Sequence, residues 1–146
     1  MQRVSSASVS VDGELLASIG PGLLVLLGVA PTDTAADADR LAARVLALRG
    51  FADADGRMNA PLADRELLCV SQFTLYADTR RGNRPSYTDA APAPIAEPLY
   101  DRFCAATGAR RGRFGAEMAV ALVNDGPVTL LLEQPPVSPG SFRVPV

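Results

Sequence analysis

Runs of apolar residues organise the first part of the chain. Residues 4–19 have the pattern of a hairpin: apolar side chains alternate with serines over residues 6–11, and Asp12-Gly13 is the turn signal of a type I′ hairpin. Residues 23–29 are apolar at every position except Gly28, which is typical of a central strand buried on both faces. The sequence therefore predicts a hairpin followed by a core strand.

Apolar positions at helical spacing predict two helices. The first begins at Thr32 or Asp33, either of which can cap a helix, and runs to about Arg49. The second covers residues 94–107, and Pro98 fits only in its first turn, so this helix should start late or bend. The inner faces are expected to be Ala38, Leu41, Ala42, Val45 and Leu48, then Ile95, Leu99, Phe103 and Ala106.

The rest of the chain reads as strands and loops. Residues 67–76 predict a strand that places Gln72 and Thr74 on one face near its end. Loops are expected over 51–62 and 78–93, and the last strands over 118–123 and 128–132. Strands and helices do not alternate strictly, so the predicted fold class is α+β. We expect one domain over residues 1–133 and a proline-rich tail, 134–146, that is extended or disordered.

The stretch 124–129 (NDGPVT) joins the last two apolar runs. It resembles a hairpin turn, but Pro127 has no N–H and fixes its own φ where a strand should begin. The Gly126-Pro127 bond can be trans, as in an ordinary turn, or cis, which is uncommon and would be a specified feature. The functional interpretation is a rigid loop that presents backbone carbonyls to a ligand. Local chemistry leaves both interpretations open.

The composition removes several classes of chemistry. The chain has no histidine and all 14 basic residues are arginine, which excludes Ser-His-Asp and Cys-His catalysis, histidine metal sites and lysine Schiff bases. The turn at residues 53–56 lacks the terminal glutamate of a calcium loop, so we expect no metal. Cys69 and Cys104 lie in apolar contexts and predict buried thiols in a reducing cytoplasm. No apolar run approaches the ~20 residues of a membrane span, and no secretory leader is recognised.

Thr74 is the obvious nucleophile by position, beside Gln72 at a predicted strand end. A threonine hydroxyl needs an adjacent base, however, and neither histidine nor lysine exists in this chain. The alternative is a hydroxyl that bonds to backbone or positions a substrate. The nearby carboxylates Glu117 and Asp125 are expected to be exposed.

Three segments in this order resemble the D-aminoacyl-tRNA deacylase family: 71–75 (SQFTL), 112–118 (GRFGAEM) and 124–129 (NDGPVT). Shorter matches are residues 2–4 (QRV), 56–59 (GRMN), 84–86 (RPS) and 99–100 (LY). The resemblance covers roughly residues 2–133. It implies a barrel-like, mostly antiparallel sheet with two main helices, and a homodimer with active sites at the subunit interface.

The resemblance implies an editing hydrolase that cleaves the ester of D-aminoacyl-tRNA, and of glycyl-tRNA mischarged on tRNA(Ala), without a cofactor. The implied partner is tRNA, with no membrane and no DNA, in the cytoplasm. The substrate's own 2′-hydroxyl would assist the attack, while residues 71–74 supply orientation and amide donors. The candidate catalytic residues are Ser71, Gln72, Phe73 and Thr74.

The resemblance also assigns roles outside that segment. The Gly126-Pro127 bond would be cis and enter the partner's site, where its carbonyls hold the substrate's amino group and its backbone excludes an L side chain. Arg3 matches the residue that holds this loop, and Ala91 lies at the pocket wall. Phe114 and Met118 match the pocket of the terminal adenosine; without the resemblance, ordinary core positions would be the preferred interpretation.

Two clusters of arginines border the site segments and are candidates for binding tRNA phosphates. A solvated surface is the alternative, because the net charge is −2 and no domain-wide basic field exists. The alternatives to the editing hydrolase are a non-catalytic tRNA-binding module and a relative with a trans Gly-Pro bond that accepts some L-aminoacyl-tRNA. The clusters are Arg80, Arg81 and Arg84, then Arg110, Arg111 and Arg113.

Overall fold

The first strand, β1 (Gln2–Val11), lies at the centre of the sheet in the computed structural model, which describes residues 1–134. It pairs antiparallel with β2 (Glu14–Ile19) and β3 (Gly22–Leu27) along one edge and with β8 (Ala119–Thr129) along the other. The predicted hairpin is confirmed: its turn residues have φ of 51° and 82°, as a type I′ turn requires. The predicted tail, apart from Gln134, lies outside the described residues.

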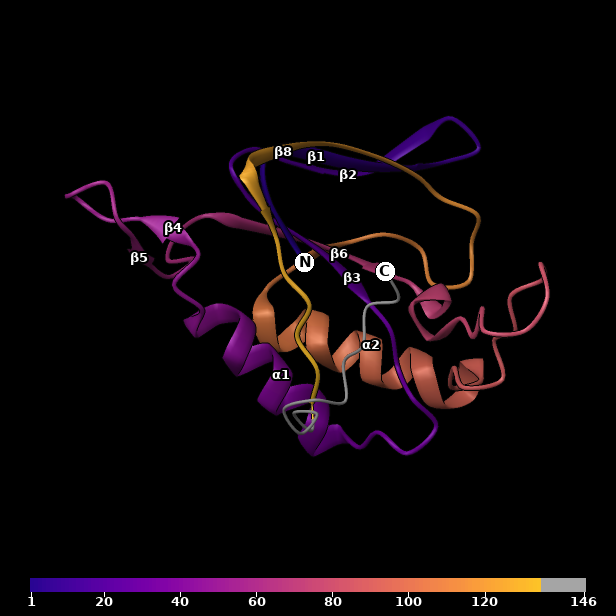
Figure 1. Ribbon diagram of the computed structural model, residues 1–146. Helices are drawn as coiled ribbons and strands as arrows, with labels where there is room; N and C mark the ends of the chain where they lie inside the picture. The colour runs from indigo at the N-terminus through magenta and orange to yellow at the C-terminus, as the bar shows by residue number, and fades with distance from the viewer. Residues whose placement is uncertain (135–146) are drawn as a thin grey trace.

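The sheet continues in parallel beyond β3. Strand β6 (Glu66–Ser71) runs parallel to β3, and the short β7 (Arg110–Arg111) runs parallel to β6. The sheet curls so that β1, β2 and β8 lie over β3 and β6 (Figure 1). The predicted α+β fold with a nearly closed, barrel-like sheet and two helices is confirmed. Its antiparallel pairs surround β1, whereas the pairs on either side of β6 are parallel.

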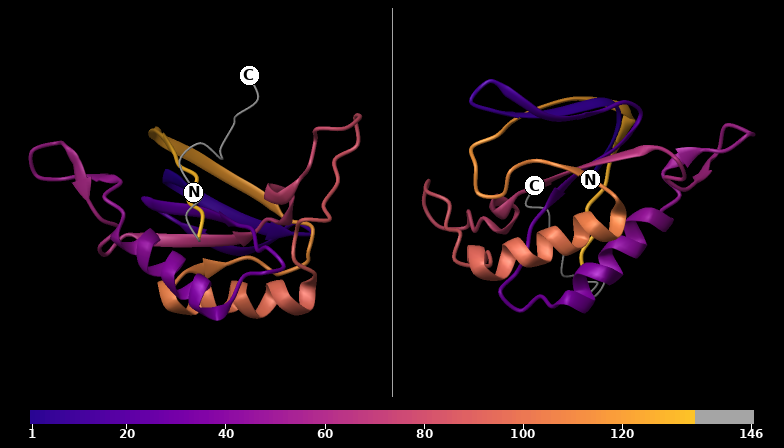
Figure 2. Two further views of the ribbon diagram at one scale, coloured as in Figure 1. Left: turned by 60° about the horizontal axis from the view of Figure 1, so that its bottom comes forward. Right: turned by 180° about the vertical axis from the view of Figure 1, so that it is seen from behind.

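Strands β3 and β6 are buried on both faces, as the continuous apolar run of β3 predicted. One face packs against the helices, and the other fills the interior of the curled sheet, where Val4, Val9 and Leu24 meet Leu68 and Val70. Figure 2 shows both helices on the same side of the sheet. The helix-facing residues of the two strands are Leu23, Val25, Leu27, Leu67 and Cys69.

The first helix, α1 (Ala35–Ala47), begins later than predicted. Its cap is Thr34 and not Thr32 or Asp33, because Thr34 and Asp37 form a capping box that satisfies two backbone N–H groups. Ala42 and Val45 are buried on its inner face. No helix within residues 1–134 combines the length and apolar character needed to cross a membrane.

The second helix, α2 (Ala93–Thr107), does not start late. Pro98 lies inside it, and Gly108 ends it with a φ of 65°. The inner face is rotated from the predicted one, since Ile95 is 39% exposed. Of the predicted positions, only Phe103 is buried; the buried residues are Ala96, Tyr100, Phe103 and Cys104.

The strand predicted over 67–76 ends at Ser71 and is followed by a 3-10 helix, η1 (Phe73–Tyr76). The physical reason is that β3, the parallel partner, ends at Leu27, whose carbonyl accepts the Gln72 N–H at 2.8 Å. A Cβ at Gly28 would lie 3.0 Å from the Tyr76 ring, so this glycine lets the end of η1 pack against β3.

The loop predicted over 51–62 contains a short hairpin of β4 (Phe51–Ala52) and β5 (Met58–Ala60), which projects from the body of the domain (Figure 1). The Asp53 carboxylate closes its turn by accepting the N–H groups of Asp55 and Arg57, each at 2.9 Å. The hairpin was not predicted, because its strands are too short to show alternation.

The two strands predicted around residues 124–127 are one strand, β8. Val4 of β1 pairs with Asn124 and Gln2 pairs with Thr129, so both runs continue along the same partner in one direction. Residues 125–128 are therefore a bulge opposite Arg3 and not a hairpin turn. The Gly126–Pro127 peptide bond is cis.

Candidate active site

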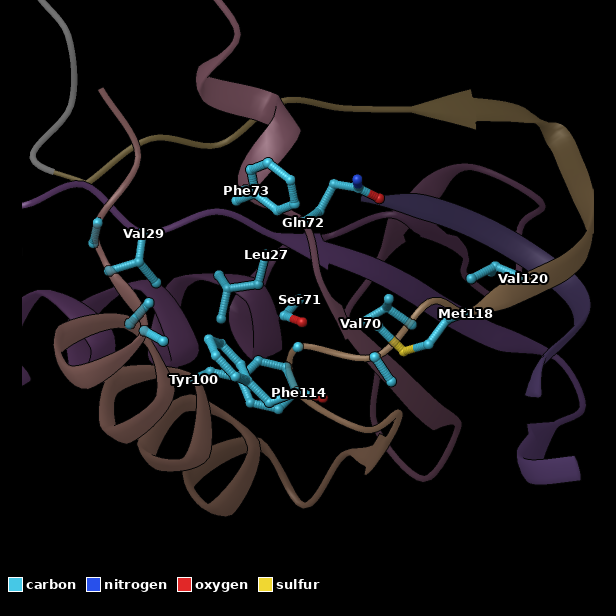
Figure 3. Close-up of a pocket in the computed structure, with 15 residues that line it drawn as sticks. Leu27, Val29, Val70, Ser71, Gln72, Phe73, Tyr100, Phe114, Met118 and Val120 are labelled. Carbon is cyan, nitrogen blue, oxygen red and sulfur yellow. The ribbon is translucent and has the colours of Figure 1, made fainter. Parts of the chain in front are cut away.

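A cavity of about 420 Å³ opens between the ends of β3 and β6, the start of η1, the first turns of α2 and residues 114–118. Its volume is in the range of small-molecule sites. Figure 3 shows Gln72 and Phe73 at the top, the rings of Tyr100 and Phe114 together below, and Ser71 between them. Six predicted site residues line it: Ser71, Gln72, Phe73, Ala91, Phe114 and Met118.

Tyr100 supports the aromatic side of the cavity. Its hydroxyl donates to the carbonyl of Cys69 at 2.9 Å, and its ring lies 5.7 Å from that of Phe114, centroid to centroid. Burial raises the pKa of Tyr100 well above its usual value, so the phenol stays neutral and keeps this bond. Cys69 and Cys104 are buried free thiols, as predicted.

The polar side of the cavity is the segment where β6 turns into η1. The Gln72 side-chain amide donates to the Thr74 hydroxyl oxygen at 2.5 Å, which is the only side-chain hydrogen bond of Thr74 within residues 1–134. An amide is a donor here and not a base, so this contact does not activate Thr74 as a nucleophile. Thr74 itself is not among the residues that line the cavity.

The first residues of η1 carry backbone N–H groups that have no backbone acceptor within residues 1–134. The N–H groups of Phe73 and Thr74 have no intrahelical acceptor, because they begin the 3-10 helix. Groups of this kind stabilise negative charge on an oxygen when they are aimed at it. They are the candidate oxyanion donors of the site.

The bulge at residues 125–128 lies outside the cavity that the other site residues form. Neither Gly126 nor Pro127 lines it, and both are exposed in the described chain. Gly126 has a φ of 120°, and a Cβ there would lie 2.5 Å from the Arg3 guanidinium and 2.9 Å from Val128. Only glycine fits this position without displacing a neighbour.

Arg3 fastens the bulge to the body of the domain. Its Nε donates to the Asp125 carbonyl at 3.2 Å, and its Nη1 donates to the Gly50 carbonyl at 2.9 Å. The Arg3 side chain is only 16% exposed. The structure therefore places Arg3 against the loop that the resemblance assigned to it.

Asn124 closes the base of the same bulge and was missed as a site residue. Its carbonyl oxygen accepts the Val128 N–H at 3.0 Å, and its amide donates to the Val128 carbonyl at 3.3 Å and to Gln2 at 3.1 Å. The side chain thus bridges both backbone groups of Val128. The sequence signal that could have marked Asn124 as a site residue was its place as the first residue of the NDGPVT segment.

The candidate phosphate-binding arginines divide into two groups. Arg80 pairs with Asp78 at 2.8 Å, Arg110 with Glu66 at 2.8 Å and Arg111 with Asp101 at 2.7 Å. The hydrogen bonds from Arg80 lower the pKa of Asp78 well below its usual range. Within residues 1–134, the arginines of these clusters without an ion pair are Arg81, Arg84 and Arg113.

Comparison with known proteins identifies the class to which this fold and cavity belong. The family model described as D-Tyr-tRNA(Tyr) deacylase matches residues 1–133. A D-aminoacyl-tRNA deacylase of Roseiflexus castenholzii is 58% identical over 142 residues, covering 91% of this chain and 89% of the relative. One of Opitutus terrae is 54% identical over 141 residues, covering 91% and 94%.

Two solved structures share the fold. A structure titled c-Myc DNA Unwinding Element Binding Protein is 40% identical, with a TM-score of 0.86 over 92% of this chain and 96% of its own. A probable eukaryotic D-amino acid tRNA deacylase is 16% identical, with a TM-score of 0.73 over 86% and 92%, and shows the fold alone. The chain belongs to the D-aminoacyl-tRNA deacylase family. Its predicted identity as an enzyme of this hydrolase class is confirmed.

Proposed function

We propose that this protein edits aminoacyl-tRNA by hydrolysing the ester of D-aminoacyl-tRNA and of glycyl-tRNA mischarged on tRNA(Ala), while it spares L-aminoacyl-tRNA. The observation that carries the proposal is one cavity that brings Ser71, Gln72 and Phe73 together with Phe114 and Met118. Segments far apart in the sequence thereby place the polar side chains of Ser71 and Gln72 and the aromatic ring of Phe114 around one cavity. That combination suits an ester joined to a nucleoside.

In this proposal the terminal adenosine binds against Phe114 and Met118, with its ester at the Ser71–Gln72 side. The N–H groups of Phe73 and Thr74 stabilise the oxyanion. A water molecule attacks the carbonyl carbon of the ester, and the ester bond breaks to release the free amino acid and the ribose hydroxyl of tRNA. The neighbouring ribose 2′-hydroxyl assists this attack, because the hydroxyl of Thr74 has an amide and not a base beside it. The catalytic role of the protein is orientation and charge stabilisation, without a cofactor.

We propose that the working form is a homodimer in which the 125–128 bulge enters the partner's cavity. The bulge is exposed and lies outside the cavity of its own chain. Apolar side chains around it are open to solvent, which is typical of a surface that a partner covers. They are Leu122 and Val123, 38% and 57% exposed, and Leu130 and Leu131, 40% and 55% exposed.

In this dimer the backbone of the 125–128 bulge would distinguish D-amino acids from L-amino acids. The carbonyls of Gly126 and Pro127 hold the substrate's amino group, and the same backbone stands where an L side chain would lie. Arg3 and Asn124 keep this wall from moving away. Glycine has no side chain to clash, so its ester is also cleaved. Ala91, 9% exposed at the cavity wall, leaves room for the substrate.

The nucleic acid partner is proposed to be tRNA and not DNA, in the cytoplasm. Arg81, Arg84 and Arg113 are the foremost candidates for phosphate contacts, because no carboxylate of residues 1–134 neutralises them. Arg80 and Arg111 would first have to leave their carboxylate partners. The expected binding is weak and salt-sensitive.

The direct test is deacylation of matched D-tyrosyl-, L-tyrosyl- and glycyl-tRNA by the pure protein with a chelator present. We expect cleavage of the D and glycyl esters, with the L ester intact. Comparable cleavage of the L ester would contradict the chiral wall and point to a relative that accepts L substrates. Binding of tRNA with no cleavage of any ester would leave only a non-catalytic tRNA-binding module.

A further inference from the structure

Two aromatic side chains stand in contact with each other and open to solvent at the edge of the cavity. The rings of Phe73 and Tyr87 lie 5.1 Å apart, centroid to centroid, at an interplanar angle of 74°. Phe73 is 57% exposed and Tyr87 is 40% exposed. The proposed function uses the backbone of Phe73 and gives Tyr87 no role. A pair of exposed rings beside a binding cavity therefore needs an explanation.

The position of Tyr87 is fixed by its loop. Asp78 and Ser86 exchange two backbone hydrogen bonds, of 2.8 and 3.0 Å, at the base of the loop. The carbonyl of Tyr87 accepts the N–H of Ala90 at 3.1 Å, and the next residue, Ala91, lines the cavity. Phe73 lines the cavity as well (Figure 3). The two rings thus continue the cavity wall outward.

The charge around the rings complements a nucleic acid backbone. Arg81 and Arg84 belong to the same loop as Tyr87, and neither has an ion pair within residues 1–134. Exposed aromatic rings beside unpaired cations are the usual means of binding a single strand, because bases stack on the rings and phosphates meet the cations. The acceptor end of tRNA is such a single strand.

We propose that Tyr87, with Phe73, forms a stacking platform for the base of the nucleotide that precedes the terminal adenosine of tRNA. The proposal rests on the proposed function, which puts that adenosine in the cavity. A strand leaving the cavity on the Phe73 side passes the Tyr87 ring first and the tip of the loop, with Arg81 and Arg84, next. The platform reads no particular base, since every base has a face to stack.

The test combines kinetics with a fluorescent base. Tyr87→Ala is compared with Tyr87→Phe, which keeps the ring, and with Leu15→Ala, which removes another exposed apolar side chain at the β1–β2 hairpin. We expect Tyr87→Ala to raise KM for D-tyrosyl-tRNA on the order of tenfold, with little change in kcat. An RNA minihelix with 2-aminopurine at the penultimate position should be quenched on binding to the native protein and to Tyr87→Phe, and clearly less on binding to Tyr87→Ala, which keeps only the Phe73 ring.

The outcomes that would overturn the platform can be told apart from a failure of the proposed function. Unchanged KM and unchanged quenching in Tyr87→Ala would overturn the platform. A loss of kcat together with a smaller particle in sedimentation would also overturn it, because the rings would then be a contact between subunits. If the native protein cleaves no D-tyrosyl-tRNA at all, the proposed function has failed, and the quenching experiment still decides whether the rings bind a base.

Discussion

Arg3 holds the main chain of Asp125, the residue directly before Gly126. Its Nε lies 3.2 Å from the Asp125 carbonyl oxygen and 3.1 Å from the Asp125 carboxylate. The guanidinium is largely buried, whereas the carboxylate is 55% exposed. An exposed ion pair contributes about 0–1 kcal/mol, and a charge-assisted bond to a fixed carbonyl contributes more. The Arg3 side chain therefore holds the loop mainly through the backbone carbonyl of Asp125.

Because Arg3 acts through the Asp125 carbonyl more than through its carboxylate, substitutions of Arg3 and of Asp125 should have different effects on activity. Arg3→Ala should lower kcat/KM for D-tyrosyl-tRNA on the order of 10- to 100-fold, because a wall displaced by about 1 Å no longer orients the substrate. Asp125→Ala removes only the exposed ion pair and should change kcat/KM by less than about threefold. Steady-state kinetics on both variants, with circular dichroism to establish folding, provides the measurement. Equal losses in the two would show that the ion pair, and not the carbonyl bond, holds the loop.

Asn124→Asp tests the other fastening of the bulge. Aspartate keeps the acceptor for the Val128 N–H but loses the donor to the Val128 carbonyl and to Gln2, and places a carboxylate near those oxygens. We expect kcat/KM for the D ester to fall about tenfold or more with little change in melting temperature, because the bulge is at the surface. Asp125→Asn, one residue further on, is the matched control. A variant as active as the native protein would remove Asn124 from the account.

Thr74→Val distinguishes a positioning hydroxyl from a nucleophile. The Thr74 oxygen accepts a bond from Gln72, so its removal should lower kcat by about tenfold at most. Thr74→Ser keeps the hydroxyl and should remain near the native rate. A loss of about 10⁴-fold or more in the kcat of Thr74→Val would instead identify the Thr74 hydroxyl as the nucleophile.

Glu66 should make the fold sensitive to acid. The N–H of Gly20 and then the guanidinium of Arg110 lower the pKa of Glu66 below its ordinary value of 4.5. Because the folded-state pKa is the lower one, the stability from Glu66 is present above about pH 4.5 and is lost as the pH falls through the folded-state value. Urea unfolding across this range should show a shallower acid decline in Glu66→Gln. Parallel curves for variant and native protein would contradict this role.

The elements of the fold that depend on local interactions could be predicted from local sequence patterns. The type I′ hairpin at Asp12-Gly13 and the core strand after it follow from alternation, turn residues and a continuous apolar run. The end of β6 at Ser71 could not be predicted, because its own residues continue the alternation. What ends the strand is the loss of its partner beyond Leu27, and that is a tertiary fact.

The site was predicted as a set of residues and not as an arrangement. Residues of the SQFTL and GRFGAEM segments line one cavity, which the sequence alone does not show. The bulge at 125–128 was hidden because its geometry depends on pairing with β1, and Arg3 lies 122 residues before Asp125. Tyr87 had no motif to mark it, and its exposure beside Phe73 is visible only in three dimensions.

The central claim is that the cavity of one subunit and the bulge of its partner make one site. Coexpression of a bulge variant, Gly126→Ala, with a cavity variant, Phe114→Ala, tests it, because each homodimer alone has both sites impaired. In a mixed dimer the intact cavity of the first chain meets the intact bulge of the second. With random pairing we predict recovery of about a quarter of the native D-tyrosyl-tRNA deacylation rate. A mixture no more active than the average of the two variants would contradict the shared site.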